Sequence, residues 1–544
     1  MKKLFKNGLF LMLLAALMLV IAACSSDSGG NDDSDSGDNT SSDETDNNDG
    51  DDEEAQGEAG GTLRIAIDAA PPTLDQPTST ATAARDASRL IFETLVTTKE
   101  NFEPEMMLAE SIETEDNQTF TINLREGVKF HNGEEMTSED VIASMERWLE
   151  KSSVTGNIFN DATWTADGDY TVILELQSPS SLTLDTMASA KQAAAIMPKE
   201  VIDNASDGVI TEFIGTGPFK FEEWKQDQYI HYVKYDEYQP VDLPADGLSG
   251  KKEALVDEIY IYIVNDSSTR LAGLQTGEYD FAYGIPYDNY DALLADDNLE
   301  TILTPSANQM MGLNKVQGIA TDPKFRQAVN AALDAEQVMF AAFPDEDFFW
   351  LDSGYMDMYI EPWLTDAGNE YYNQANPERA KELLDEIGYN NEEFRIMTTR
   401  DYDHHYNSGV VIQEQLKQAG INAVLEVYDW PSLLDKREND LGAWDAFMTS
   451  SSTVSTPPQL IGMSTTWAGG MDDSYVEETM AAIEGAPTIE EAKELWDELQ
   501  LYAWEELVPI VHFGGYHSLY GHTKNVKGIT NNTGPIFWNV TVSE

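Results

Sequence analysis

The chain has 544 residues, with 98 Asp and Glu against 32 Lys and Arg, which gives a formal net charge of −66 at pH 7. A field of that sign repels nucleic acid and anionic lipid, so neither is expected as a partner. We interpret the excess of carboxylates as an adaptation to high salt or high external pH, where they keep a secreted protein solvated.

The first 23 residues have the layout of a secretory signal. Lys2, Lys3 and Lys6 are positive, and the apolar run at 9–20 is too short to cross ~30 Å of hydrocarbon. The ending Ile-Ala-Ala-Cys resembles the lipobox of bacterial lipoproteins, which implies that Cys24 becomes the lipidated first residue. Cys24 is the only cysteine, so it has no disulfide partner. An ordinary signal peptide cut near Ala23 is the alternative.

An acidic segment, 24–60, follows the signal. From Ser25 to Gly60 it holds no aromatic residue and no Lys or Arg, so it cannot bury enough apolar surface to order itself. We interpret it as a disordered tether, and a flexible coil of about 35 residues reaches roughly 30–35 Å. The acidic run at 46–51 lacks the terminal Glu and the flanking helices of a calcium loop, so we interpret it as solvated charge.

Beyond the tether, hydrophobic period and turn residues predict strands mixed with helices. In chain order, strands are predicted at 61–67, 119–124, 170–176, 219–224, 229–235, 258–264, 421–428 and 509–513. Helices are predicted at 84–95, from 137–140 onward, and at 267–276, 322–332, 377–387, 410–419 and 490–506. The fold class is therefore α/β, and the chain shows no internal repeat.

Several segments together resemble the family 5 extracellular solute-binding proteins, which include oligopeptide, dipeptide and nickel binders. The stretch most typical of that family ends in Phe-His-Asn-Gly at 130–133 and Thr-Ser-Glu-Asp at 137–140. The similar segments lie at 109–112, 120–133, 137–141, 215–219, 274–280, 325–330, 380–384 and 415–421. Within them we interpret Gly217-Pro218 as turn chemistry and His131 as a hydrogen-bonded structural residue.

The resemblance implies a two-lobed periplasmic-binding-protein-like fold (type II, cluster C-like) with an extra small subdomain and a hinge cleft. Lobe I would comprise residues 61–95, 206–263 and 501–544. The extra subdomain would comprise 96–205 and lobe II 264–500, with hinge crossings near 264–265 and 507–509.

The resemblance also implies ligand-binding residues. His404, in the segment that begins at Thr399, falls where an oligopeptide binder has a ligand-lining histidine. Trp430 and Arg437 reproduce the spacing of a pocket tryptophan and an arginine, whose guanidinium can bind a carboxylate bidentately. Tyr283 matches an aromatic residue near the family's cleft. A core Trp and a surface Arg on a helix are the alternative interpretation of that pair.

The segment 449–458 departs from the peptide binders. They anchor the ligand's α-amino group with an Asp that follows a Gly-Trp pair, whereas this segment contains no acid and no tryptophan. A buried ammonium requires a compensating carboxylate. Either another acid supplies it or the ligand has no free amine there.

These features predict a lipid-anchored monomer on the outer face of the cell membrane that captures a peptide or peptide-like solute and delivers it to ABC permease subunits. No cofactor is expected. The alternatives are a nickel, metal-chelate or other non-peptide solute binder, and a peptide-sensing surface receptor. His404 and His405 would point to opposite faces of a strand, which disfavours direct metal coordination. The chain has no Gly-x-Ser-x-Gly or His-Glu-x-x-His motif, so an enzyme is not expected.

The charge leads to a prediction about stability. We expect the melting temperature to rise with NaCl concentration, because salt screens the repulsion among the carboxylates. Thermal unfolding from low to molar NaCl measures the effect. Equal stability over that range would contradict adaptation to high salt.

Overall fold

The computed structural model describes residues 59–206, 208–465, 467, 469–470 and 472–543. The predicted signal, Cys24 and the tether up to residue 58 lie outside the described residues. Among the residues described, no helix has both the length and the apolar composition needed to cross a membrane.

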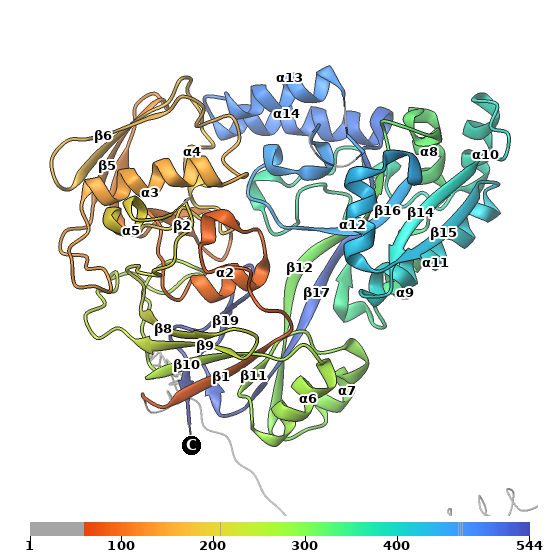
Figure 1. Ribbon diagram of the computed structural model, residues 1–544. Coiled ribbons are helices and arrows are strands. Elements are labelled where there is room, and N and C mark those ends of the chain that lie inside the picture. Colours follow the sequence, from red (N-terminus) through yellow and green to blue (C-terminus); the bar gives the residue numbers. More distant parts are fainter. Residues whose placement is uncertain (1–58, 207, 466, 468, 471, 544) are drawn as a thin grey trace, which may run out of the picture. The chain divides into compact units, whose positions relative to one another are not determined.

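The central feature of the described chain is one mixed sheet of eleven strands (Figure 1). Its order is β15-β14-β16-β12-β17-β11-β1-β10-β9-β8, and β13 pairs with β17. In chain order the strands are β1 Thr62–Ile67, β8 Phe219–Lys225, β9 Tyr229–Lys234, β10 Glu258–Ile263, β11 Phe281–Ala282, β12 Leu299–Leu313, β13 Phe349–Trp350, β14 Glu393–Thr399, β15 Asn422–Tyr428, β16 Ala446–Ser452 and β17 Ile510–Thr523. Both parallel pairs, such as β1 with β10, and antiparallel pairs, such as β12 with β17, occur in it.

Smaller sheets accompany it. A four-stranded antiparallel sheet has the order β4-β5-β7-β6, formed by Ala109–Glu113, Thr119–Leu124, Thr171–Glu175 and Thr163–Ala166. Three two-stranded sheets pair β2 Val96–Thr98 with β3 Pro104–Met106, β18 Val526–Lys527 with β21 Thr541–Val542, and β19 Thr530–Asn531 with β20 Pro535–Ile536.

The helices of the described residues are distributed along the whole chain. They are α2 Thr82–Ser88, α3 Ser138–Lys151, α4 Thr183–Met187, α5 Lys199–Asp203, α6 Ser267–Thr276, α7 Tyr290–Leu294, α8 Pro323–Ala332, α9 Ala335–Ala342, α10 Pro377–Glu386, α11 Asp403–Gln418, α12 Trp430–Asn439, α13 Ser474–Glu484 and α14 Ile489–Tyr502.

The core consists of separate buried clusters. One surrounds β1, β9, β10 and β11 and includes Ile65 and Phe281. Another lies between the four-stranded sheet and α3 and includes Trp148. A third surrounds β14, β16, α8 and α11 and includes Phe325 and Ile396. The chain therefore builds several cores rather than one continuous one.

The long strands β12 and β17 connect two of these cores (Figure 1). Ile302 and Tyr520 pack on the cluster around β1, whereas Met311 and Phe513 belong to the cluster around β14. Two irregularities interrupt the pairing, between Pro305 and Ala307 and between Gln309 and Met310. Bulges of this kind bend a strand and re-aim side chains.

Most of the predicted strands are confirmed. The prediction at 119–124 matches β5, and the alternating burial of β5 explains why its period of two was visible. The helix at 267–276 is confirmed as α6, which Asp266 caps and which Gly277 ends with φ 74°.

Two predicted helices have the wrong bounds. The helix predicted at 84–95 ends at Ser88, because the carbonyls of Leu90 and Ile91 accept hydrogen bonds from the N–H groups of Phe219 and Gly217. The helix predicted at 410–419 begins at Asp403, so His404 and His405 lie on a helix and not on a strand.

The Gly-Thr-Gly-Pro segment makes a close backbone approach. A Cβ at Gly215 would lie 2.0 Å from the carbonyl oxygen of Ile91, so only glycine fits. His131 holds the same segment: its Nδ1 accepts from the N–H of Gly215 at 3.3 Å, and its Nε2 bonds to the carbonyl of Gly217 at 2.9 Å. Burial lowers the pKa of His131 to about 4. The predicted structural role of His131 is confirmed.

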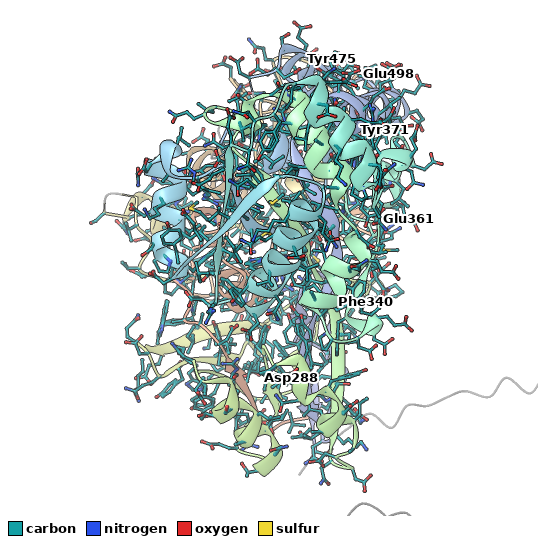
Figure 2. All side chains as sticks on the ribbon, turned by 90° about the vertical axis from the view of Figure 1, so that its right-hand side faces the viewer. Asp288, Phe340, Glu361, Tyr371, Tyr475 and Glu498 are labelled. Carbon is teal, nitrogen blue, oxygen red and sulfur yellow. The ribbon has the colours of Figure 1, made fainter. Side chains whose placement is uncertain are left out.

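Many acidic residues of the folded part are exposed at its surface. Figure 2 shows Asp288, Glu361 and Glu498 on one face, and all three are exposed. The same face carries Phe340 and Tyr475, which are 45% and 39% exposed. Water therefore solvates these carboxylates directly.

A buried ion pair joins α3 to the segment before Gln76. Nη1 and Nη2 of Arg147 donate to the two carboxylate oxygens of Asp75 at 2.9 and 2.5 Å, and both side chains are 5% exposed. We predict that Arg147→Met lowers the free energy of unfolding by about 3 kcal/mol, because it leaves the Asp75 carboxylate buried without a partner.

Denaturant unfolding measures this loss. Lys199→Met is the matched control, because it removes one partner of the exposed Lys199–Asp203 pair and should cost less than about 1 kcal/mol. Equal effects of the two substitutions would contradict the prediction.

Candidate ligand-binding cleft

Three adjoining cavities form a cleft along β12, β16 and β17. The central cavity has a volume of about 380 Å³, the second about 200 Å³ and the third about 300 Å³. Lys191 and Ser452 line both the central and the second cavity, while Ser306 and Tyr520 line both the central and the third. Because they share wall residues, the three cavities adjoin one another.

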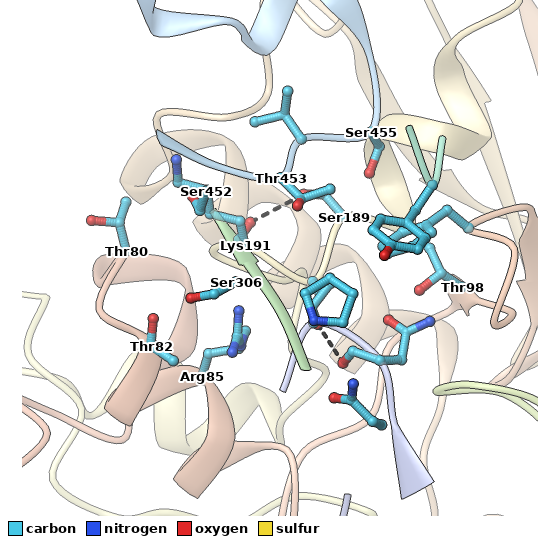
Figure 3. Close-up of a pocket in the computed structure, with 18 of the residues that line it drawn as sticks. Thr80, Thr82, Arg85, Thr98, Ser189, Lys191, Ser306, Ser452, Thr453 and Ser455 are labelled. Carbon is cyan, nitrogen blue, oxygen red and sulfur yellow. Dashed lines mark hydrogen bonds between the residues drawn. The ribbon is translucent and has the colours of Figure 1, made fainter. Parts of the chain in front are cut away.

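Segments far apart in the sequence supply the walls of the central cavity (Figure 3). Its lining comes from the start of α2, the turn after β2, the loop at 189–192, the middle of β12 and β17, the end of β16 and the turn after β19. Ser306 is the extra residue of the first β12 bulge, so the irregular pairing with β17 is what places this side chain at the cavity.

Hydroxyl groups dominate this lining. The hydroxyl side chains are those of Ser79, Thr80, Thr82, Thr98, Ser189, Ser306, Tyr359, Ser452, Thr453, Ser455, Tyr520 and Thr533. A hydroxyl can both donate and accept a hydrogen bond. The central cavity therefore suits a solute with many polar atoms.

Five buried polar atoms in the cleft have no hydrogen-bond partner among the described residues. In the central cavity they are Thr98 Oγ1, His517 Nδ1 and Asn532 Oδ1, and in the second cavity Tyr355 Oη and His512 Nε2. Leaving such a group unsatisfied costs about 1–3 kcal/mol. Other unsatisfied buried atoms, such as Trp164 Nε1 and Thr523 Oγ1, lie elsewhere among the described residues, so atoms of this kind do not by themselves mark a binding site.

Positive charge exceeds negative charge beside the central cavity. Arg85 lines it, and its Nε donates to Asp86 at 2.8 Å. Nη2 of Arg89 lies 3.0 Å from the same carboxylate oxygen, and Arg89 also donates to the carbonyl of Asn532. One carboxylate thus faces two guanidinium groups, and burial lowers the pKa of Arg89 to about 10.

The segment that departs from the peptide binders lies in the cleft. Ser450 and Ser451 line the second cavity, and Thr453 lines the central one. The nearby carboxylate of Asp357 accepts a hydrogen bond from Thr453 Oγ1 at 2.8 Å. Burial raises the pKa of Asp357, and the side chain stands behind Thr453 rather than in the lining of either cavity.

Of the five residues inferred from the resemblance, Tyr283 lines the third cavity. Its hydroxyl donates to Asp86 Oδ2 at 3.3 Å, and burial raises its pKa well above the ordinary value. Tyr402, which lines the same cavity, contacts the rings of His404 and Trp430 with centroids 5.8 and 5.3 Å away.

His404 and Trp430 therefore stand behind Tyr402. The His404 ring also stacks on Phe343 at 5.8 Å, and burial lowers its pKa to about 4. Thr399 is fully buried, and its hydroxyl accepts from the N–H of Asp401 at 3.1 Å.

Arg437 lies on α12, about two turns after Trp430. Its guanidinium pairs with Glu438 at 2.5 Å and stands 5.4 Å from the ring centroid of Phe447. The linings of the three described cavities do not include Arg437, His404, Trp430 or Thr399.

No motif pointed to Lys191, Thr98, Arg85, His517 or Asn532. Two of them, Lys191 and Asn532, come from irregular segments that carry no periodic pattern. The Ser- and Thr-rich segment 449–456 was the one visible signal, since it marks where the lining differs from that of the peptide binders. In the part of the chain that the structure describes, no group of three His, Cys, Asp or Glu side chains is arranged to hold a metal ion.

Known proteins resemble this chain over most of its length. The probable peptide ABC transporter periplasmic-binding protein y4tO of Sinorhizobium fredii is 27% identical over 500 residues, which cover 89% of this chain and 93% of that protein. The oligopeptide-binding protein AppA of Bacillus subtilis is 26% identical over 428 residues, covering 74% of this chain and 75% of AppA.

Solved structures share the fold. AgaA from A. tumefaciens R10, in complex with agropinic acid, aligns with a TM-score of 0.72 at 26% identity and covers 89% of this chain and 99% of its own. AppA in complex with a nonapeptide aligns with a TM-score of 0.71 at 22% identity and covers 88% of this chain and 97% of its own. These are two-lobed periplasmic binding proteins, so the predicted two-lobed α/β fold is confirmed.

The model of the bacterial extracellular solute-binding proteins, family 5, matches residues 103–472, which is more than half of the chain. With the cleft and the fold, this match shows that the chain belongs to that family.

Proposed function

We propose that this protein captures peptides or peptide-like solutes in the three-cavity cleft and delivers them to the permease subunits of an ABC importer. The three adjoining cavities carry this proposal, because their hydroxyl groups and the basic side chains of Arg85 and Lys191 suit a solute with many polar atoms. The y4tO and AppA names and the nonapeptide bound to AppA support a peptide ligand. Agropinic acid in AgaA supports a broader, peptide-like range.

The fold suggests how capture proceeds. Lobe I would comprise 61–95, 206–263 and 501–544, the extra subdomain 96–205 and lobe II 264–500. We place the hinge at the chain crossings near 264–265 and 507–509, and the paired strands β12 and β17 also contribute residues to both main cores. A solute that touches both sides favours the closed form by its differential affinity for that form.

The proposed cellular setting follows from the N-terminal sequence. Lipidation at Cys24 would hold the protein at the outer face of the membrane, and the acidic tether would give the folded part reach. We expect it to act as a monomer, with no cofactor and no turnover of the solute.

The proposed function predicts what the purified protein carries. Mass spectrometry of the small molecules released by denaturation should find peptides or peptide-like solutes bound to the wild-type protein. Ser452→Trp should lose them, because Ser452 lines two cavities and an indole would fill the space between them.

The control is Ser268→Trp, on the exposed surface of α6, which should retain the solutes. Retention by Ser452→Trp would show that the solute binds elsewhere. Absence of any solute from the wild-type protein, also after exposure to complex growth medium, would contradict solute capture.

We also propose Trp430, Arg437, His404, Thr399 and Tyr283 as ligand-binding residues. If a carboxylate of the solute pairs with Arg437, which lies outside the lining of the three cavities, Arg437→Ala should weaken solute binding by about 2 kcal/mol or more, because that carboxylate loses its partner. Titration calorimetry with the released solute measures the change, and Arg437→Lys tests whether the bidentate geometry matters. Unchanged affinity would remove Arg437 from the site and leave it in its pair with Glu438.

A further inference from the structure

Lys191 is a charged residue in the wall of the cleft. It lines both the central and the second cavity, and in the second it is the only Lys, Arg, Asp or Glu of the lining. It makes no ion pair with any described residue, and its backbone carbonyl accepts a hydrogen bond from Ser189 Oγ at 3.4 Å. The side chain is partly buried, and burial lowers its pKa.

The partly buried ammonium of Lys191 has lost part of its hydration and has no ion-pair partner among the described residues. Removing an ammonium from water is costly unless an anion or hydrogen-bond acceptors replace the water. Other buried basic side chains meet this need within the chain: Lys315 donates to the carbonyls of Leu313 and Pro509, and Lys252 lies 3.4 Å from Glu93. Lys191 differs from them because its head group is directed at the cleft (Figure 3).

The acids around the cleft do not supply the missing anion. Glu100 lines the central cavity but is exposed to solvent. Asp68 and Asp86 line the third cavity, where Asp86 is held between Arg85 and Arg89. Asp357 is bound by Thr453 outside the lining.

The neutral groups around Lys191 also select a ligand. Hydroxyls of Thr80, Ser189 and Ser452 line the central cavity with it, and Thr98 Oγ1 and Asn532 Oδ1 are buried there without partners. These groups match a solute with several hydroxyl or similar polar groups. A free ammonium would meet Lys191 and Arg85 instead of a carboxylate, which is unfavourable.

We propose that the solute is an anionic, hydroxyl-bearing small molecule whose carboxylate or phosphate group binds Lys191, and which has no free ammonium in the central and second cavities. An ordinary peptide with a free α-amino group does not fit this description. The proposal rests on the proposed function and narrows its ligand class.

The test compares what wild-type protein and three variants retain. Protein stripped of solute is exposed to complex growth medium and washed, and the released molecules are quantified by accurate-mass spectrometry. The variants are Lys191→Met, which removes the charge at similar length, Lys191→Arg, which restores it, and Lys417→Met, which removes one exposed charge on α11. Melting temperatures verify that each variant is folded.

The expected result is a solute of net negative charge at neutral pH, retained at least tenfold less by Lys191→Met and undiminished on Lys191→Arg and Lys417→Met. Accurate mass separates a carboxylate from a phosphate. A neutral or cationic solute, a peptide with a free α-amino group, or equal retention by Lys191→Met would overturn this proposal while leaving solute capture intact. Retention of the solute by Ser452→Trp would instead overturn the proposed function, and this inference with it.

Discussion

The pairing of β12 with β17 is the constraint on which the rest of the structure depends. These two strands belong to both main cores, so each core fixes one end of the pair and the segment between them is held from both sides. The cavities lie along this middle segment, where Pro305, Ser306 and His517 contribute to the lining. A proline cannot donate to the ladder, and the pairing of β12 with β17 becomes irregular directly after Pro305.

The cleft is maintained against its own free-energy cost. Each orphan polar atom costs about 1–3 kcal/mol in the absence of solute, and an unpaired Lys191 adds to that cost. The well-packed clusters around it offset this cost, and buried networks such as Arg147 with Asp75 fix the walls. Affinity then follows from the hydroxyl groups and basic side chains of the cavity walls, which a solute can contact directly.

The sequence predicted the regular elements well because their signals are local. Alternation marked β5, and Asp266 and Gly277 marked the ends of α6. The helix bounds were wrong where contacts with distant residues determine them. The carbonyls after Ser88 accept hydrogen bonds from the segment that leads into the strand at Phe219. The start of α11 is fixed by packing of His404 and His405 against aromatic rings. No local pattern records either contact.

The site was predictable only in outline for the same reason. The segment 449–456 indicated an altered lining because it contains no acidic residue and no tryptophan. The resemblance pointed to Tyr283, which lines the third cavity. Lys191 and Asn532 could not be identified, because a lysine in an irregular segment has the sequence signature of any solvated surface lysine. Their role becomes visible only when segments more than three hundred residues apart meet at one cavity.

The acidic surface and the cationic cleft impose opposite demands on an anionic solute. The net charge of −66 repels it at long range, whereas Lys191 and Arg85 attract it at contact. Salt separates the two effects, since the screening length falls from about 10 Å at 0.1 M to about 3 Å at 1 M. Surface carboxylates further than this from the cleft cease to act on the solute, while a partly buried contact with Lys191 is screened much less. At high ionic strength, the excess of carboxylates can keep the surface solvated without repelling an anionic solute from the cleft. The acidic surface and the basic cleft are therefore both consistent with a saline environment.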